Sequence, residues 1–211
     1  ESSRSGYRRR NTPPVFADMW QEEVRYLLNV PTDDLKVDGM RVSPGYDYPK
    51  APNQSVFLTR PQMIETCRSI VSFGDRSRWR VFHTPLFLDF LAGNQTYECT
   101  PWSMPLRTVF GWQKPCYLVG EGYVQSFKEL MEGTNWDDYG VGKYEKCANC
   151  MVHCGFEGTA ATDSIRHPLK MFSIGRKGVR TTGPMAPDID LSNQRPAQDV
   201  HSSHVERELE I

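Results

Sequence analysis

The grouping of the cysteine residues is the sequence feature that most limits how this chain folds. Five of its six cysteines lie in one stretch, at Cys99, Cys116, Cys147, Cys150 and Cys154. Core packing gives no reason for such grouping, because a free cysteine in a core acts as a small apolar side chain. Clustered thiols are typical of disulfide frameworks or metal centres. The grouping therefore predicts a cross-linked or metal-bound segment.

The N-terminal residues favour the metal centre. The sequence begins Glu1-Ser-Ser-Arg4 and shows no apolar signal core, so nothing in it supports secretion. Disulfides are rare where the thiols are kept reduced, whereas metal sites are common there. We expect a cytoplasmic chain with a metal or iron–sulfur site. The sequence does not start with Met, and we expect it to be a fragment of a longer protein.

Composition narrows the function classes. The 25 Lys and Arg residues balance 26 Asp and Glu residues, which gives a net charge of -1. Nucleic-acid binders normally carry a basic excess, so we expect no nucleic-acid partner. No apolar run approaches the ~18 residues that a membrane span needs. The most apolar stretch, residues 85–92, is interpreted as a buried helix rather than as part of a substrate cavity or a membrane contact.

The first half of the chain shows the alternation of an α/β fold. Apolar spacing predicts a helix over residues 17–28 and a strand over 35–42. A second helix is predicted after Thr59, with Pro61 in its first turn, and a short strand over 78–82. Alternating helices and strands favour a parallel sheet. Cys67 lies on the apolar face of the second helix, where we interpret it as a core residue.

The pattern changes after about residue 93. Two short runs, residues 107–112 and 116–119, predict a hairpin. Ser126 followed by Glu129 is a capping-box pattern, which indicates a helix start. Residues 136–146 are predicted to be loop. Residues 165–197 carry four prolines and little periodicity, so irregular structure is predicted there.

These patterns divide the chain into four parts. We expect a flexible lead-in at residues 1–16, an α/β part at 17–92 and a small α+β cysteine-rich metal-binding domain at 93–164. An irregular tail, with a short helix over residues 200–211, is expected at 165–211.

The cysteine spacing suggests which thiols act together. Cys147 and Cys150 form a Cys-x-x-Cys turn, which places two thiolates close enough for one metal centre. Cys99 and Cys116, brought in by the predicted hairpin, complete four sulfur ligands. Thiolates are soft ligands that suit iron–sulfur clusters or zinc. Cys154 is a spare thiol or an alternative fourth ligand.

Several segments resemble a known family. The run Cys99-x11-Gly111-x4-Cys116 resembles the opening of auxiliary-cluster domains in radical S-adenosylmethionine enzymes. The chain is similar, over roughly residues 36 to 211, to the C-terminal half of the adenosylhopene transferase family of hopanoid biosynthesis. The segments that carry the resemblance are residues 42–46, 86–97, 99–102, 109–113, 115–123, 147–153 and 183–187.

The resemblance implies both a fold and an activity. It implies that residues 17–92 are the last part of a partial (β/α) barrel, with Ser43, Pro44 and Gly45 at the face where barrels bind cofactors. The turn tendency of these three residues explains them equally well. The family cleaves S-adenosylmethionine at a 4Fe-4S cluster and transfers the 5'-deoxyadenosyl radical to hopene, forming adenosylhopane. Hopene is apolar, so the full enzyme is expected to contact the membrane peripherally.

The resemblance is incomplete in one respect. The radical-generating Cys-x3-Cys-x2-Cys motif is absent from this sequence, and Cys147-x2-Cys150-x3-Cys154 has the reverse spacing. The cluster implied here is therefore an auxiliary one on Cys99, Cys116, Cys147 and Cys150. The alternative is a non-catalytic, zinc-stabilised module that binds a protein partner through the loops around Trp102, Trp112 and Trp136.

Overall fold

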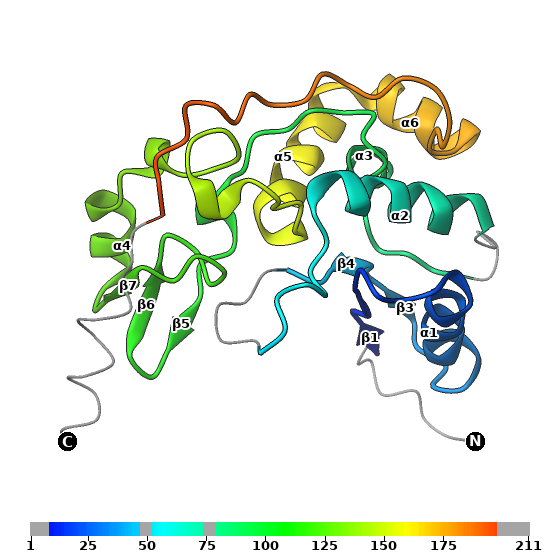
Figure 1. Cartoon of the computed structure of the whole chain (residues 1–211), viewed down its shortest axis with the longest axis horizontal. Coiled ribbons are helices and arrows are strands. Elements are labelled where there is room, and N and C mark those ends of the chain that lie inside the picture. Colours follow the sequence, from blue (N-terminus) through cyan, green and yellow to red (C-terminus); the bar gives the residue numbers. More distant parts are fainter. Residues whose placement is uncertain (1–8, 47–51, 74–78, 198–211) are drawn as a thin grey trace. The chain divides into compact units, whose positions relative to one another are not determined.

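The computed structural model describes residues 9–46, 52–73 and 79–197, and the chain divides into two compact units (Figure 1). Unit 1 comprises Glu1–Gln95 and Ala160–Ala186. Unit 2 comprises Thr96–Thr159 and Pro187–Ile211. The chain therefore leaves unit 1, builds unit 2, and returns to unit 1 before its final segment.

Unit 1 is an α/β structure with short parallel strands. Its elements are β1 (Arg10–Asn11), β2 (Pro14–Val15), α1 (Gln21–Asp33), β3 (Gly39–Met40), β4 (Ser43–Pro44), α2 (Arg60–Phe73), α3 (Pro85–Leu91), the end of α5 (His153–Arg166) and α6 (Pro168–Lys177). Strand β1 pairs with β3 and β2 pairs with β4, both in parallel. Val81 forms a further parallel bridge with Met40.

The parallel pairing agrees with the predicted alternation of helices and strands. Helix α1 connects the first strands to β3, and α2 connects β4 to Val81, so each parallel pair is joined through a helix. Within the described residues the sheets are small and do not close into a barrel. The partial barrel stays a prediction.

The predicted flexible lead-in is wrong for residues 10–15. The amide of Arg41 donates to the carbonyl of Asn11 at 2.9 Å, and Val15 is fully buried. The short extended segments carry too little periodicity to be recognised, yet their backbone groups complete the sheet. Helix α1 also begins and ends later than predicted. The Glu23 carboxylate accepts the Trp20 amide at 2.7 Å and fixes its start.

Helix α3 is the centre of the unit 1 core. The Thr84 hydroxyl accepts the Phe87 amide at 3.2 Å, and Pro85 occupies the first turn. Leu86, Phe87 and Phe90 are fully buried. This confirms the interpretation of residues 85–92 as a buried helix.

Unit 2 contains an antiparallel sheet of three strands in the order β5 (Arg107–Thr108), β6 (Gly111–Lys114) and β7 (Gly122–Val124). The predicted strand over residues 116–119 is wrong. Pro115 has no amide to donate to a ladder, and the next residues form a turn in which the Gly120 amide donates to the Cys116 carbonyl at 3.1 Å. Residues 122–124 supply the strand instead.

The helices of unit 2 are short. They are η1 (Pro101–Ser103), α4 (Phe127–Gly133), η2 (Trp136–Asp138), η3 (Glu145–Cys147) and the first part of α5. The capping box of α4 is confirmed, since the Glu129 amide donates to the Ser126 hydroxyl at 3.1 Å. The loop predicted over residues 136–146 contains the single turns η2 and η3.

The prediction of irregular structure over residues 165–197 is wrong for its first part. Helix α5 continues to Arg166 and α6 follows at once. Pro168, one of the four prolines in this stretch, occupies the first turn of α6, where the missing amide costs nothing. Gly178, with φ of 90°, ends the helix. The helix predicted over residues 200–211 lies outside the described residues.

None of the helices in the described ranges is long and apolar enough to cross a membrane.

Candidate functional site

Unit 2 brings together cysteines that are far apart in sequence. Cys116 follows β6, whereas Cys147 ends η3, yet both pack in one apolar cluster with Val119 and Tyr144. Cys154 lies in the first turn of α5. The thiol of Cys99 interacts electrostatically with those of Cys116, Cys147 and Cys154. That of Cys150 interacts with those of Cys99, Cys154 and Cys116.

The four predicted ligands and the spare thiol therefore occupy one region of unit 2. Cys67, the sixth cysteine, lies apart from this group in unit 1. It is buried, which agrees with its interpretation as a core residue. The spacing of the cysteines in the sequence predicted that they act together. The fold of unit 2 brings Cys99 and Cys116 close to Cys147, Cys150 and Cys154.

In the protein without a bound metal, burial keeps these thiols protonated. It raises the pKa of Cys147 to about 11 and that of Cys154 to about 11. Burial, reinforced by the neighbouring thiols, also raises the pKa of Cys99 and Cys150. Several adjacent thiolates cannot coexist in a buried site without a positive charge among them. A metal centre supplies that charge and deprotonates the thiols that bind it.

Backbone amides are directed at the sulfur atoms. The amides of Val119 and Leu118 hydrogen-bond to the sulfur of Cys116, which opposes the rise of its pKa by burial. The Gly140 amide acts in the same way on Cys147, and the Val152 amide on Cys150. Amide donors stabilise thiolates and help to set the potential of an iron–sulfur cluster. The donor set therefore fits a thiolate-bound metal centre.

Cys99 is held against the start of α5. A Cβ added at Gly155 would overlap the Cys99 sulfur, so only glycine permits this approach. The next residue, Thr100, donates its amide to the Gly155 carbonyl at 2.7 Å, and the Ser103 hydroxyl donates to the Cys154 carbonyl at 2.9 Å. These bonds fix the Cys99 segment on the turn that carries Cys154.

Within the described residues, no three His, Cys, Asp or Glu side chains are arranged around a single metal ion. Zinc requires its four donors in one tetrahedral shell. In a four-iron cluster each thiolate binds a different iron, so the sulfur atoms stand farther apart. A zinc site and a four-iron cluster therefore require different distances between the sulfur atoms. The iron, zinc and sulfide content of the protein distinguishes the two.

The predicted cofactor residues Ser43, Pro44 and Gly45 lie in unit 1. Ser43 and Pro44 form β4, and the Gly45 amide donates to the Val15 carbonyl at 2.6 Å. A Cβ at Gly45 would overlap the ring of Phe16. Strand pairing and packing are sufficient to explain these three residues. Their binding of S-adenosylmethionine stays a prediction.

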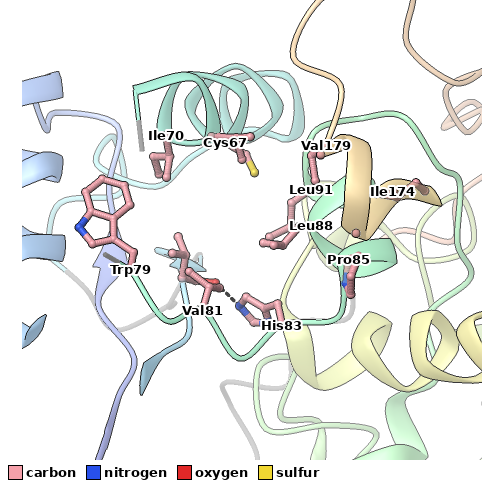
Figure 2. A pocket seen from close by; sticks show the side chains of 14 residues that line it. Cys67, Ile70, Trp79, Val81, His83, Pro85, Leu88, Leu91, Ile174 and Val179 are labelled. Carbon is pink, nitrogen blue, oxygen red and sulfur yellow. Dashed lines mark hydrogen bonds between the residues drawn. The ribbon is translucent and has the colours of Figure 1, made fainter. Parts of the chain in front are cut away.

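Unit 1 contains an apolar pocket (Figure 2). Its volume is about 260 Å³. The lining residues are Val42, Cys67, Ile70, Val71, Trp79, Val81, His83, Pro85, Leu88, Leu91, Ile174, Gly175, Gly178 and Val179. Nearly all are apolar, so the wall offers few hydrogen-bonding groups to a ligand. The apolar faces of α2 and α3 were predicted from the sequence, whereas α6, which contributes Ile174 and Gly175, lies in a segment predicted to be irregular.

His83 is the one ionisable ring in the pocket wall. Its Nε2 lies 2.9 Å from the Val42 carbonyl, which orients the ring (Figure 2). The ring also packs on Phe87, with ring centroids 4.7 Å apart. A carbonyl partner makes Nε2 the protonated nitrogen. His83 is therefore held in place beside the space for a ligand.

The structure thus defines a protein class with an α/β unit that carries an apolar pocket and a second unit that gathers buried thiols. A family model described as a domain of unknown function, DUF3463, matches residues 40–174, and the chain belongs to this family. The match includes all six cysteines and the greater part of the pocket wall. No curated protein and no solved structure matches the chain.

Proposed function

We propose that this chain is the C-terminal portion of a radical S-adenosylmethionine enzyme of hopanoid biosynthesis. In this proposal unit 2 holds an auxiliary 4Fe-4S cluster on Cys99, Cys116, Cys147 and Cys150. The observation that carries the proposal is the gathering of five thiols in unit 2, three buried and two half-buried. Backbone amides are directed at the sulfur atoms of Cys116, Cys147, Cys150 and Cys154.

The cluster would be structural or would relay electrons. Four thiolates leave no iron open for a substrate. The amides of Val119 and Gly140 would hydrogen-bond to the sulfurs of Cys116 and Cys147 and set the electron affinity of the group. Cys154 would remain outside the ligand set, where the Tyr117 hydroxyl donates to its sulfur.

Unit 1 supports the substrate part of the proposal. A cavity of about 150 Å³ accepts benzene, so one of about 260 Å³ accepts a larger hydrocarbon of a few fused rings at most. The pocket would take part of hopene and exclude water from it. In the full enzyme, Ser43, Pro44 and Gly45 of unit 1 would contribute to the binding of S-adenosylmethionine. We place this enzyme in the cytoplasm.

The experiment is metal analysis after anaerobic purification. About four irons and four sulfides per chain are expected, with loss of both in Cys147→Ser. Cys67→Ser is the matched control, because Cys67 is equally buried but lies in unit 1. Iron without sulfide, or full iron content in Cys147→Ser, would contradict the cluster assignment.

The second candidate function is a zinc-stabilised module that binds a protein partner. One observation favours it: Trp102 is 42% exposed and packs edge-on against Trp136, with ring centroids 5.8 Å apart. Trp136 is half-buried, and tryptophans that are partly exposed in this way are typical of interface centres. About one zinc and no sulfide in the same analysis would support this function in place of the first.

A further inference from the structure

Large apolar side chains are exposed where α5 passes into α6. Ile165 is 81% exposed, Leu169 84% and Phe172 64%. Single exposed apolar residues need no explanation, but a group of them on one face marks an interaction site. All three residues belong to unit 1.

The geometry of α6 explains why these side chains face outward. Leu169, Phe172 and Arg176 are spaced by three and four residues, so they share one face of the helix. The opposite face is occupied within unit 1. There Ile174 and Gly175 line the apolar pocket, and a Cβ at Gly175 would stand 3.6 Å from Pro85. Helix α6 is thus apolar on both faces, and packing within unit 1 accounts for only one.

The residues around the exposed face are basic. The sequence has no Asp or Glu between Asp163 and Asp188, a stretch that contains Arg166, Lys170, Arg176, Lys177 and Arg180. Lys170 pairs with Asp163 at 2.7 Å, and Arg180 donates to the Pro184 carbonyl at 2.8 Å. Arg166, Arg176 and Lys177 are exposed. In a chain with a net charge of -1, this is a strong local positive charge.

We propose that this surface docks on an anionic lipid bilayer. The α6 surface is defined here as Ile165, Arg166, Leu169, Phe172, Arg176 and Lys177. Apolar residues flanked by basic ones are typical of helices that lie in the membrane interface. Leu169 and Phe172 would enter the headgroup–acyl boundary, while Arg176 and Lys177 would contact lipid phosphates.

Charge favours a bilayer over a second copy of the chain. A symmetric dimer through the α6 surface would place its arginines and lysine against the same residues of the partner. Like charges at an interface oppose association, whereas an anionic membrane attracts every one of them. The inner face of α6 lines the apolar pocket, so docking would place one pocket wall next to the lipid.

The membrane proposal depends on none of the cysteines, so its test is independent of the proposed metal centre. The experiment is flotation of the full chain with vesicles of phosphatidylcholine alone and with vesicles that also contain phosphatidylglycerol. Binding is expected only to the second kind and should weaken as salt is raised. Removing both charges in Arg176→Gln/Lys177→Gln should weaken binding about 25-fold, from roughly fivefold per charge.

The apolar part is tested by Leu169→Asn/Phe172→Asn, which should weaken binding at least about tenfold. The matched control is Tyr26→Asn/Leu35→Asn, because these residues are 71% and 54% exposed in the same unit but lie near acidic side chains. Unchanged binding is expected for this control. Equal binding to both vesicles, or equal binding by all variants, would overturn the proposal. So would a dimer in solution that Leu169→Asn/Phe172→Asn converts to a monomer.

Discussion

The sulfur of Cys99 lies against the α-carbon of Gly155, at a place where any Cβ would overlap it. The two residues are joined a second time through Thr100, whose amide and hydroxyl both donate to the Gly155 carbonyl, at 2.7 Å and 2.9 Å. Gly155, which follows Cys154, therefore determines the position of Cys99, the thiol of the group that is most distant from it in sequence.

Gly155→Ala should weaken metal binding without unfolding unit 2. The added methyl group forces the Cys99 side chain to rotate away, and loss of such positioning typically costs about 10- to 100-fold in metal affinity. Metal content after dialysis against a chelator measures this. Gly133→Ala is the matched control, because a Cβ there meets no atom within 4 Å. Equal metal retention by the two variants would rule out the role given to Gly155.

Cys154→Ser should keep its full metal content. The proposed ligand set excludes Cys154, whose sulfur already has a partner in the Tyr117 hydroxyl. The same iron and sulfide analysis checks this, with Cys150→Ser as the neighbouring variant that should lose both. If Cys154→Ser loses the cluster and Cys99→Ser retains it, the fourth ligand is Cys154.

Cys67 should be inert in the folded chain. Burial raises the pKa of its thiol from 9.0 to about 12, so the thiol is neutral at pH 8 and does not react with alkylating reagents. Mass spectrometry after alkylation should find it modified only in denaturant. Rapid modification in the native state would show that the pocket wall opens.

The same shift makes stability depend on pH. Above pH 9.0 the unfolded chain loses the Cys67 proton while the folded chain keeps it, so stability falls as the pH rises through the range up to about 12. The free energy of unfolding of the wild type should fall faster than that of Cys67→Val, by up to about 1.4 kcal/mol per pH unit. Denaturant titrations at several pH values measure the difference. Parallel curves would contradict it.

Thr84→Ala should destabilise unit 1 by about 1 kcal/mol. It removes the hydroxyl that accepts the Phe87 amide at the start of the buried helix α3. Thr84→Ser keeps the hydroxyl acceptor and should therefore retain most of the wild-type stability. Urea unfolding of the two variants gives the comparison, and equal stabilities would show that the cap contributes nothing.

Filling the pocket should abolish hydrocarbon binding. Cys67→Phe places a ring at the cavity wall, whereas Ser72→Phe adds the same ring on an exposed side of α2. Naphthalene should quench or shift Trp79 emission in the wild type and in Ser72→Phe but not in Cys67→Phe. Thermal unfolding confirms that both variants fold. Binding by all three would place the ligand elsewhere.

The sequence by itself determined the features that depend on local spacing. Apolar periods predicted alternating helices and strands over residues 17–82, and the parallel bridge between Met40 and Val81 agrees with this alternation. The strands β1, β2 and β4 were not predicted. The Ser126 capping box and the start of α2 at Arg60 follow from bonds within one turn. The grouping of thiols was likewise visible as spacing.

Only the tertiary structure decided the features that depend on contacts between distant residues. Pro168 is compatible with a break or with a helix start, and packing of α6 on α3 selects the helix. The pocket forms because α6 returns to unit 1, and Cys99 reaches the other thiols because Gly155 leaves room. Such contacts join residues whose separation along the chain carries no periodic signal, so no local pattern encodes them.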